Sequence, residues 1–465
     1  MNPSRRNRTT MLGLVLSGVI VAAVAGSMTI APGAALGPTP SGAAVGPAGS
    51  PDASGGVPSP SPLRSDQVVH RPTEVFGFLP YWSMADWTDG YLRYDLLTTI
   101  AFFGVGVRQT GSLIQSGAGF EALQSARGAT IIQHAHAAGV RVVITFESFG
   151  VTRNHAFLAS AKARAAFVTQ AIAFVTSHGL DGLNLDVEGV SAADRPAFGE
   201  LVGAVATAMH AANPASEVSV AVNANVSGAR MAQVALAAGV DRAFLMGYAY
   251  RVASSPTVGS IAPYSGVGTT LDLVKSLDLY AANGVPSERI ILGLPYYGLT
   301  WPTVSDEPHA ARQPAAAGFG SGRSFRPRTI VATGPPSGSF LDYDPVEQAA
   351  RRTWYDVDRG TWYQTYFDDP TTLAPKEHLA VERGLAGVGI WALGDDAGQP
   401  GYWETIATTL GIGSPDTTAA PSASASAGSS PGPSASPTSS APGSPTSSAP
   451  GSSASPGASP ASARP

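Results

Sequence analysis

The chain has 465 residues, enough for one large domain or two ordinary ones, and 44% of them are hydrophobic, so a full-sized core can form. The formal net charge of −5 gives no electrostatic case for binding nucleic acid. The sequence contains no cysteine, which excludes disulfides, thiolate metal sites and cysteine nucleophiles.

Residues 1–31 have the features of an export signal. A basic n-region precedes an uncharged stretch that runs from Met11 to Ala31, and Ala23-Val24-Ala25 resembles a small-residue cleavage site. The basic residues are Arg5, Arg6 and Arg8. The uncharged stretch is close to the roughly 20 residues that span a bilayer, which leaves open a signal peptide or an uncleaved membrane anchor. We therefore expect a bacterial protein that is secreted or associated with the cell envelope.

Two segments of low complexity flank the central part of the chain. Residues 32–69 are mostly Pro, Gly, Ala and Ser, and residues 413–465 repeat variants of Ser-Ala-Pro-Gly with almost no charge. Such compositions bury too little apolar surface to offset the entropy of ordering, so we predict a disordered linker and a disordered tail. The tail ends without an apolar anchor, so we expect membrane contact only through an uncleaved N-terminal segment.

Residues 70–412 alternate short apolar runs with longer segments of helical spacing, such as Ala161–Ser177 and Pro196–Ala212. Gly139, Gly179, Gly239 and Gly284 punctuate the ends of these segments. The predicted strands are Val75–Leu79, Thr98–Val107, Arg141–Phe146, Leu183–Val187, Val218–Asn223, Ala243–Tyr248, Ile290–Pro295 and Gly387–Leu393.

Strands that alternate with helices imply parallel crossovers, and eight such units close most naturally into an α/β (β/α)8 TIM barrel. A doubly wound open sheet is the structural alternative, although no glycine fingerprint after a first strand favours it. The stretch after the seventh strand, Trp301–Asp358, is long and irregular and predicts a small insertion.

The segment Asp181-Gly182-Leu183-Asn184-Leu185-Asp186-Val187-Glu188 carries the candidate chemistry. Alternate residues of a strand face opposite ways, so its three apolar side chains share one face while Asn184, Asp186 and Glu188 share the other. Two carboxylates in a barrel lumen repel each other, and holding a proton between them yields a general acid. Glu188 lies last on the strand, where barrel active sites form. The alternation alone is equally compatible with a half-exposed strand whose acids are solvated.

The same segment resembles the Asp-Gly-x-Asp-x-Asp-x-Glu signature of family-18 glycoside hydrolases, the chitinase-like family, with Asn184 in place of the middle Asp. The resemblance extends over Val75 to Trp403 and is closer to bacterial cell-wall and spore-cortex members than to large secreted chitinases. The other matching segments are Phe76–Trp82, Met246-Gly247-Tyr248, Leu292–Gly298 and Gly387–Trp391.

This resemblance implies an exported glycosidase that cleaves β-linked N-acetylglucosamine units of peptidoglycan or chitin-like glycans, with the substrate's acetamide as nucleophile. It implies that Glu188 protonates the leaving oxygen and then activates water. It also implies that Asp186 orients the acetamide, Tyr248 hydrogen-bonds the acetamide oxygen, and Trp391 forms the floor under the sugar. No metal or organic cofactor is required, and we expect a monomer.

The resemblance further implies that Asp181 and Asn184 support Asp186. Tyr81 and Tyr297 fall near predicted strand ends, where aromatic side chains line sugar subsites or simply pack. Trp82, Trp87, Tyr250 and Trp301 share that position and the same two interpretations.

Two departures from the family pattern favour an alternative, a glycan-binding, lectin-like cell-wall protein with weak or no turnover. Ala249 stands where the family usually has Asp or Asn, and Thr145–Gly150 lacks the usual Ser-x-Gly-Gly. In addition, Asn184 cannot share a proton with Asp186 as an Asp would, from which we expect a shifted pH optimum. Lectin-like relatives usually lose the catalytic Glu, and this chain keeps Glu188. A wall-anchored structural protein, with its tails as the functional part, is a third alternative.

The histidines and acidic pairs that could serve as metal ligands do not indicate a metal site. His134 and His136 occupy different faces of a predicted helix, and ligands must converge. The acidic pairs Asp368-Asp369 and Asp395-Asp396 offer calcium ligands, but solvated turn acids are the favoured interpretation. No phosphate loop and no Gly-x-Ser-x-Gly elbow occurs, so nucleotide and serine-hydrolase chemistry have no support.

Overall fold

The computed structural model describes residues 60–314 and 317–412. The expected export signal, the first part of the expected linker and the expected tail lie outside these residues. Among the helices that are described, none combines the length and the apolar character needed to cross a membrane.

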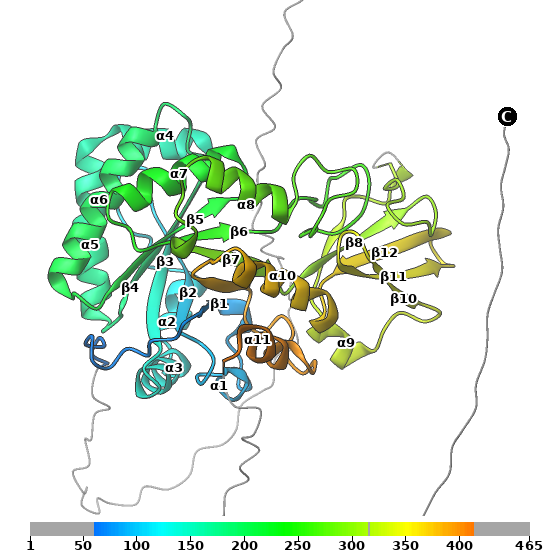
Figure 1. Ribbon diagram of the computed structural model, residues 1–465, viewed down its shortest axis with the longest axis horizontal. Coiled ribbons are helices and arrows are strands. Elements are labelled where there is room, and N and C mark those ends of the chain that lie inside the picture. Colours follow the sequence, from blue (N-terminus) through cyan, green and yellow to red (C-terminus); the bar gives the residue numbers. More distant parts are fainter. Residues whose placement is uncertain (1–59, 315–316, 413–465) are drawn as a thin grey trace, which may run out of the picture. The chain divides into compact units, whose positions relative to one another are not determined.

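Eight parallel strands form a closed barrel in the order β1-β13-β7-β6-β5-β4-β3-β2 (Figure 1). The strands are β1 (Glu74–Pro80), β2 (Thr99–Gly106), β3 (Arg141–Phe149), β4 (Gly182–Glu188), β5 (Glu217–Asn223), β6 (Arg242–Met246), β7 (Ile290–Pro295) and β13 (Gly387–Trp391). Each overlaps one predicted strand. Because β1 pairs with both β2 and β13, the sheet has no open edge, which confirms the (β/α)8 barrel and excludes the doubly wound sheet.

Helices cover the outside of the barrel and connect its strands (Figure 1). They are α1 (Thr88–Tyr91), α2 (Ala118–Gln124), α3 (Ala126–Ala137), α4 (Val151–Ala159), α5 (Ala161–Ser177), α6 (Arg195–Ala212), α7 (Val226–Ala237), α8 (Leu273–Ala282), α10 (Pro370–Glu382) and α11 (Tyr402–Leu410). Ser125, Ser160 and Asn225 cap three of them by accepting a hydrogen bond from a backbone N–H in the first turn. Two single-turn 3-10 helices, η1 (Tyr81–Ser83) and η2 (Ser287–Arg289), complete the set in the barrel.

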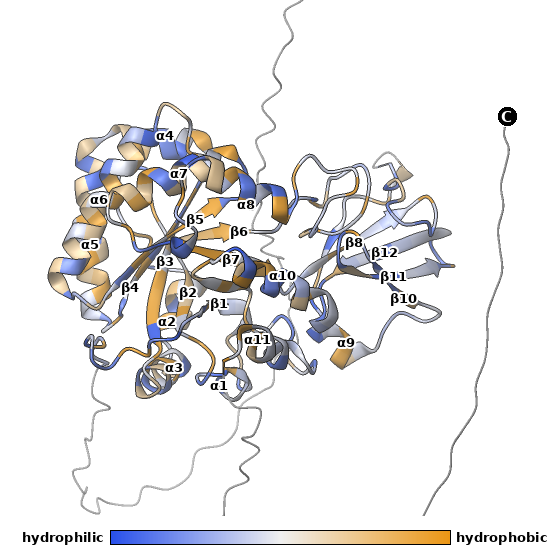
Figure 2. Ribbon diagram, in the orientation of Figure 1, coloured by the Kyte–Doolittle hydropathy of each residue, from blue (hydrophilic) through white to orange (hydrophobic). Residues whose placement is uncertain are grey.

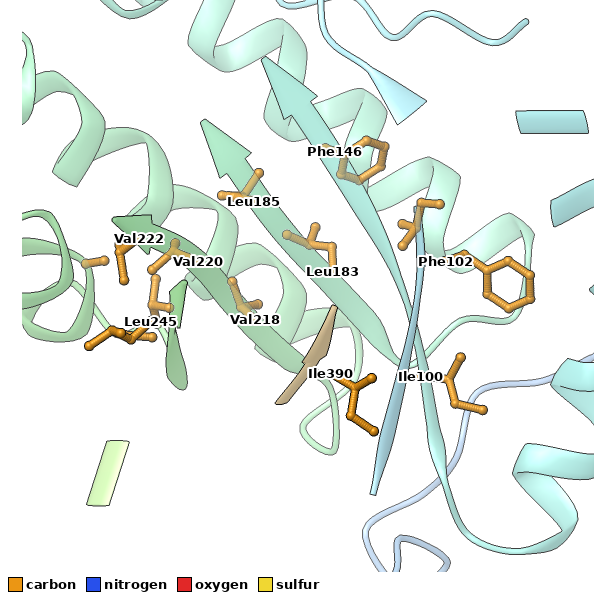
Figure 3. Close-up of a cluster of buried hydrophobic side chains, with 14 of the residues drawn as sticks. Ile100, Phe102, Phe146, Leu183, Leu185, Val218, Val220, Val222, Leu245 and Ile390 are labelled. Atoms are coloured by element: carbon orange, nitrogen blue, oxygen red, sulfur yellow. The ribbon is translucent and has the colours of Figure 1, made fainter. Parts of the chain in front are cut away.

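Two apolar layers hold the barrel together. The outer layer fills the space between strands and helices and includes Phe146, Leu183, Leu185 and Val220 (Figure 3). The inner layer fills the lumen with a separate cluster: Phe76, Phe78, Ala101, Val143, Phe244 and Ile291. The barrel strands are accordingly hydrophobic along much of their length, whereas polar residues gather on the outer helices (Figure 2).

Phe244 at the centre of the inner layer depends on two glycines. Gly293 of β7 and Gly389 of β13 are partners in register, and a Cβ atom added to either would overlap the ring of Phe244. The lumen accommodates the ring because neither β7 nor β13 carries a side chain at that level.

The insertion after β7 is a five-stranded antiparallel sheet in the order β10-β11-β12-β8-β9. Its elements are β8 (Gly298–Thr303), β9 (Arg323–Phe325), α9 (Arg328–Thr333), β10 (Phe340–Asp344), β11 (Ala349–Asp356) and β12 (Thr361–Phe367). The predicted insertion is therefore confirmed, but it is larger and more regular than expected, because the strand pairing begins at Gly298 and ends at Phe367.

The folded domain begins earlier than the predicted boundary at residue 70. Leu63 and Val68 are buried together with Ala215, and the backbone N–H of Val69 donates to the carbonyl of Gly139. Residues 60–69 therefore do not belong to a disordered linker. The prediction failed because composition averaged over 32–69 hides the apolar side chains at the end of that stretch.

We predict that Gly389→Ala lowers the free energy of unfolding by about 1–3 kcal/mol, because the added methyl group overpacks the lumen against Phe244. Urea unfolding measures the change. Gly90→Ala is the matched control, because no atom lies within 4 Å of the added Cβ. The cost in Gly389→Ala/Phe244→Leu should be smaller than the sum of the single costs; simple additivity would contradict this packing account.

Candidate active site

Strand β4 divides its side chains as its alternation predicts. Leu183, Leu185 and Val187 are buried in the outer layer, so Asn184, Asp186 and Glu188 face the lumen. Asn184 is fully buried, Asp186 is 7% exposed and Glu188 is half-buried at the carboxyl end of the strand. The exposed fraction of these three polar residues thus rises toward the end of the barrel where active sites form.

Burial dominates the electrostatics of the two carboxyl groups. It raises the pKa of Asp186 well above its ordinary value, and the negative charges of Glu188 and Glu147 raise it further. Burial also raises the pKa of Glu188 to about 7, although hydrogen bonding to the side chain of Asn223 lowers it. The two groups therefore hold at least one proton near neutral pH, and the interpretation as solvated acids is wrong.

Glu147 of β3 supplies a third carboxyl group that the sequence analysis did not assign to the site. It is the partner of Asp186 in the register between β3 and β4, and burial raises its pKa. Its Oε2 would lie 3.0 Å from a Cβ atom at Gly104, so only a glycine leaves this carboxylate undisturbed. The alternation of Thr145 and Glu147 around outward-facing Phe146 is the same signal that identified β4, and it would have revealed this residue.

Aromatic rings surround Trp391 at the end of β13. Its ring centroid lies 4.8 Å from that of Phe103, 5.3 Å from that of Phe78 and 6.3 Å from that of Trp82. Tyr81 packs edge-on against Trp82 at 5.0 Å, one ring removed from Trp391. The sequence does not identify Phe103 as a site residue, because an aromatic residue within an apolar strand gives no sign of its position in the site.

Tyr248 lies with Trp391 in the group of half-buried side chains that pack on the inner apolar cluster. Burial raises the pKa of Tyr248, with further contributions from Tyr297, Asp186 and Glu188, so its hydroxyl is protonated and close to the acids. The rings of Tyr248 and Tyr297 are 6.2 Å apart. The structure therefore brings together the predicted residues on β4, β13 and the loop after β6.

Several polar atoms in the lumen have no hydrogen-bond partner among the described residues. They include Thr145 Oγ1, Asn184 Oδ1 and Asp186 Oδ1. Asn184 uses its amide to donate to Ser219 Oγ at 2.9 Å, so no hydrogen bond of its own orients Asp186. Buried polar atoms normally find partners, which makes these groups available to an entering molecule.

Asp181 does not join the site, which corrects the predicted support of Asp186. Its carboxylate accepts hydrogen bonds from Leu63 N at 2.6 Å and Val142 N at 2.7 Å, and it contacts His136 Nε2 at 2.8 Å. Asp186 lies five positions further along the extended chain, or about 16 Å away. It fastens residues 60–69 to the opposite end of the barrel.

The acidic pairs are not solvated turn acids, contrary to the favoured interpretation. Asp368 is buried against Lys376 Nζ at 2.5 Å, while Asp369 caps α10. Asp395 and Asp396 are also buried, and burial raises each pKa to about 7. Asp395 forms an ion pair with Arg326 of the insertion at 2.9 Å, so this pair joins the insertion to the barrel.

One group of described residues has the spacing of metal ligands: His309, Asp344 and Glu347. Arg251 Nη1 contacts both carboxylate oxygens of Glu347, at 2.8 and 3.0 Å. A guanidinium that already matches this charge disfavours a cation, so the group acts as an ion-pair network between the insertion and the loop after β6. The two histidines considered earlier contact different acids, His134 with Asp89 and His136 with Asp181.

Ala249, the residue after Tyr248, has a backbone φ of +60°. Asn and Asp adopt this left-handed conformation more readily than Ala does. Ala249 therefore holds this conformation without a side chain that favours it.

We predict opposite stability effects for Asp181→Asn and Asp186→Asn. The first weakens hydrogen bonds to two buried N–H groups and lowers the free energy of unfolding by about 1–3 kcal/mol. The second removes a carboxyl group whose pKa is raised in the folded state. Because such a group binds more protons in the folded than in the unfolded protein, the wild type loses stability as pH rises above about 4, the ordinary value of an aspartate.

Urea unfolding between pH 5 and 8 tests this contrast. The advantage of Asp186→Asn over the wild type should grow with pH, whereas Asp181→Asn should be less stable than the wild type at every pH. An Asp186→Asn variant that is destabilised throughout this range would contradict the electrostatic account.

Known proteins resemble this chain in sequence and in fold. The model of the glycosyl hydrolases family 18 matches residues 74–396. Chitotriosidase-1 of Mus musculus is 24% identical over 264 residues, which are 53% of this chain and 56% of that protein. The cortical fragment-lytic enzyme of Bacillus anthracis is 22% identical over 304 residues, which are 64% of this chain and 65% of that protein. The chain therefore spans less than two thirds of the length of these relatives.

The fold has close counterparts among solved structures. Catalytic domain 2 of the group II chitinase of Ostrinia furnacalis superposes with a TM-score of 0.63 at 19% identity, covering 74% of this chain and 98% of that chain. At this level of identity the likeness concerns the fold alone.

Proposed function

Because the chain belongs to glycosyl hydrolase family 18, we propose that it is an exported glycosidase that cleaves β-linked N-acetylglucosamine-containing glycans of the peptidoglycan or chitin type. The observation that carries this proposal is the buried pair Asp186 and Glu188, with a pKa of about 7 at Glu188, beside Tyr248. A carboxyl group that is protonated near neutral pH can serve as a general acid.

In the proposed reaction Glu188 donates its proton to the glycosidic oxygen as that bond breaks. The acetamide oxygen of the substrate attacks the anomeric carbon and forms a cyclic, positively charged oxazolinium ion. Glu188, now a carboxylate, then removes a proton from the water that opens this ion. Trp391 provides the apolar floor for the reacting sugar.

Asp186 fits the role of partner to the acetamide. Its Oδ1 has no hydrogen-bond partner among the described residues, so it is free to accept from the acetamide N–H. Burial beside Glu188 and Glu147 raises the pKa of Asp186 and so favours its neutral form. A positive charge that forms next to Asp186 favours the ionised form instead. The carboxylate thus becomes most favourable when the oxazolinium ion forms. Tyr248, protonated because it is buried, donates to the acetamide oxygen.

We predict that Glu188→Gln reduces turnover of a chromogenic chitobiose or chitotriose glycoside at least ~10²-fold, because general acid–base catalysis contributes about that much. Release of the chromophore measures turnover, and equal thermal unfolding of both proteins is the control for folding. Near-zero turnover in the wild type as well, with glycan binding intact, would favour the lectin-like alternative over the enzyme. Side-by-side digestion of purified peptidoglycan and chitin, with mass analysis of the products, then distinguishes the two substrates.

We predict that kcat/KM falls as pH rises through about 7, because the free enzyme must hold the proton of Glu188. Hydrogen bonding to Asn223 lowers this pKa, so Asn223→Ala should move the alkaline limb of the profile to higher pH. Asn283→Ala is the control, because that side chain bonds the carbonyl of Leu279 in α8. An alkaline limb that does not move, or that moves to lower pH, would refute the assignment.

A further inference from the structure

The two faces of the insertion sheet differ in character. On one face Trp301 and Tyr366 pack with Val258 and Ile261. The opposite face is buried at Thr365 and Phe367 of β12 and partly exposed at Arg352 and Trp354 of β11. Trp354 of β11 and Tyr363 of β12 are partners in register and therefore lie on the opposite face, where their rings stack at 5.4 Å with an interplanar angle of 13°. Trp354 is partly exposed, whereas Tyr363 is only 2% exposed.

Three arginines surround this stacked pair. Arg323 of β9 lies 5.9 Å from the ring centroid of Tyr363, and Arg359 Nη1 donates to Tyr363 Oη at 3.1 Å. Arg352 lies on the same face as Trp354, two residues before it. Its Nη1 donates to Ser339 Oγ at 3.2 Å, and its buried Nε has no hydrogen-bond partner among the described residues. We call Arg323, Arg352, Trp354, Arg359 and Tyr363 the arginine patch.

The charges of the arginine patch are not neutralised locally. In the described part of the chain, no carboxylate lies within 4.0 Å of a guanidinium nitrogen of Arg323, Arg352 or Arg359. By contrast, Arg351 on the other face of the same strand pairs with Asp342 at 2.5 Å. Asp356 accepts from the backbone N–H of Arg359, and Asp358 directly precedes Arg359 in the chain, so the three arginines outnumber these two acids. In a protein of net charge −5, this is a local surplus of positive charge.

The arginine patch is continuous with the candidate active site. Phe325 of β9 lies on the same face as Arg323 and packs against Phe367 of β12 at 5.1 Å. The next residue, Arg326, lies 5.7 Å from the ring centroid of Trp82, which in turn lies 6.3 Å from Trp391. Figure 1 shows the sheet of β8, β11 and β12 beside the barrel. A polymer held at Trp391 can therefore extend along this face.

We propose that the arginine patch is a distal subsite for a carboxylated amino-sugar strand, in which the arginines bind carboxylates of the glycan and Trp354 stacks on a sugar ring. Guanidinium groups match carboxylates with paired hydrogen bonds, and indole faces suit the apolar face of a sugar. A neutral chitin strand would leave the arginines without partners. The inference rests on the proposed function and selects, between its two substrates, the acidic peptidoglycan type.

Binding in a Glu188→Gln background tests this without turnover. Calorimetry compares peptidoglycan glycan strands stripped of their peptides, which keep a lactyl carboxylate on every second sugar, with chitohexaose, whose sugars are uncharged. We expect the strands to bind at least about tenfold tighter, the ratio that corresponds to one charge-assisted hydrogen bond. We also expect this preference to shrink as NaCl rises from about 20 to 200 mM, because salt screens exposed charges.

Replacement of Arg323, Arg352 and Arg359 together by Gln should reduce the preference ratio at least about tenfold. Arg230→Gln, at an exposed position of α7 with no recorded partner, is the matched control and should leave the ratio unchanged. Trp354→Ala should weaken both ligands, because stacking does not depend on charge. An unchanged ratio in the triple variant would overturn the proposal, as would equal wild-type affinity for both ligands.

Failure of this subsite and failure of the proposed function are distinguishable. An unchanged ratio in the triple variant, with wild-type turnover of chitooligosaccharides intact, removes the subsite and leaves the glycosidase. Absence of turnover in the wild type, with the ratio still dependent on the arginines, removes the glycosidase and leaves an acidic-glycan-binding site. If the triple variant lost binding to a phosphate-bearing wall polymer but still bound the carboxylated strands as the wild type does, that result would also overturn the proposal.

Discussion

The burial of two carboxyl groups side by side in a closed barrel is the constraint on which the site depends. No basic side chain is among the described groups that shift the pKa of Asp186 or Glu188, so neither charge is offset by a cation. The low polarity of the surroundings therefore acts directly on the proton equilibrium and keeps a proton at Glu188 near neutral pH. A cation placed beside the pair would stabilise the fold and remove the general acid.

The barrel positions this pair by separating two apolar layers. Leu183, Leu185 and Val187 anchor β4 to the helices, which leaves its other face to the lumen. The lumen is closed below by Phe244, which fits only because Gly293 and Gly389 lack side chains. Polar groups can then gather beyond Phe244, at the carboxyl ends of the strands, where the aromatic rings around Trp391 lie. The packing around Phe244 and the chemistry at the strand ends are thus separate properties of the same strands.

The chain departs from its family at positions whose consequences are local. Glu147 adds a negative charge next to Asp186, in the strand that lacks the usual glycines. Ala249 carries a left-handed backbone without the side chain that tolerates it best. Neither departure removes Glu188 from its place beside Tyr248. The insertion adds a second kind of surface, basic and aromatic, to a protein that is acidic as a whole.

The sequence by itself determined the eight strands, the lumen-facing set on β4 and the family, because side-chain alternation and motif spacing are local properties of the chain. Only the tertiary structure decided which acids share an environment. Asp181 and Asp186 lie in one motif, but Asp181 precedes β4 and Asp186 lies near its carboxyl end, whereas Glu147 and Asp186 are far apart in sequence and adjacent in register. The burial of Asp395 and the order of residues 60–69 likewise depend on partners elsewhere in the chain. Composition and local sequence pattern do not identify partners that are distant in the chain; only the packed structure brings them together.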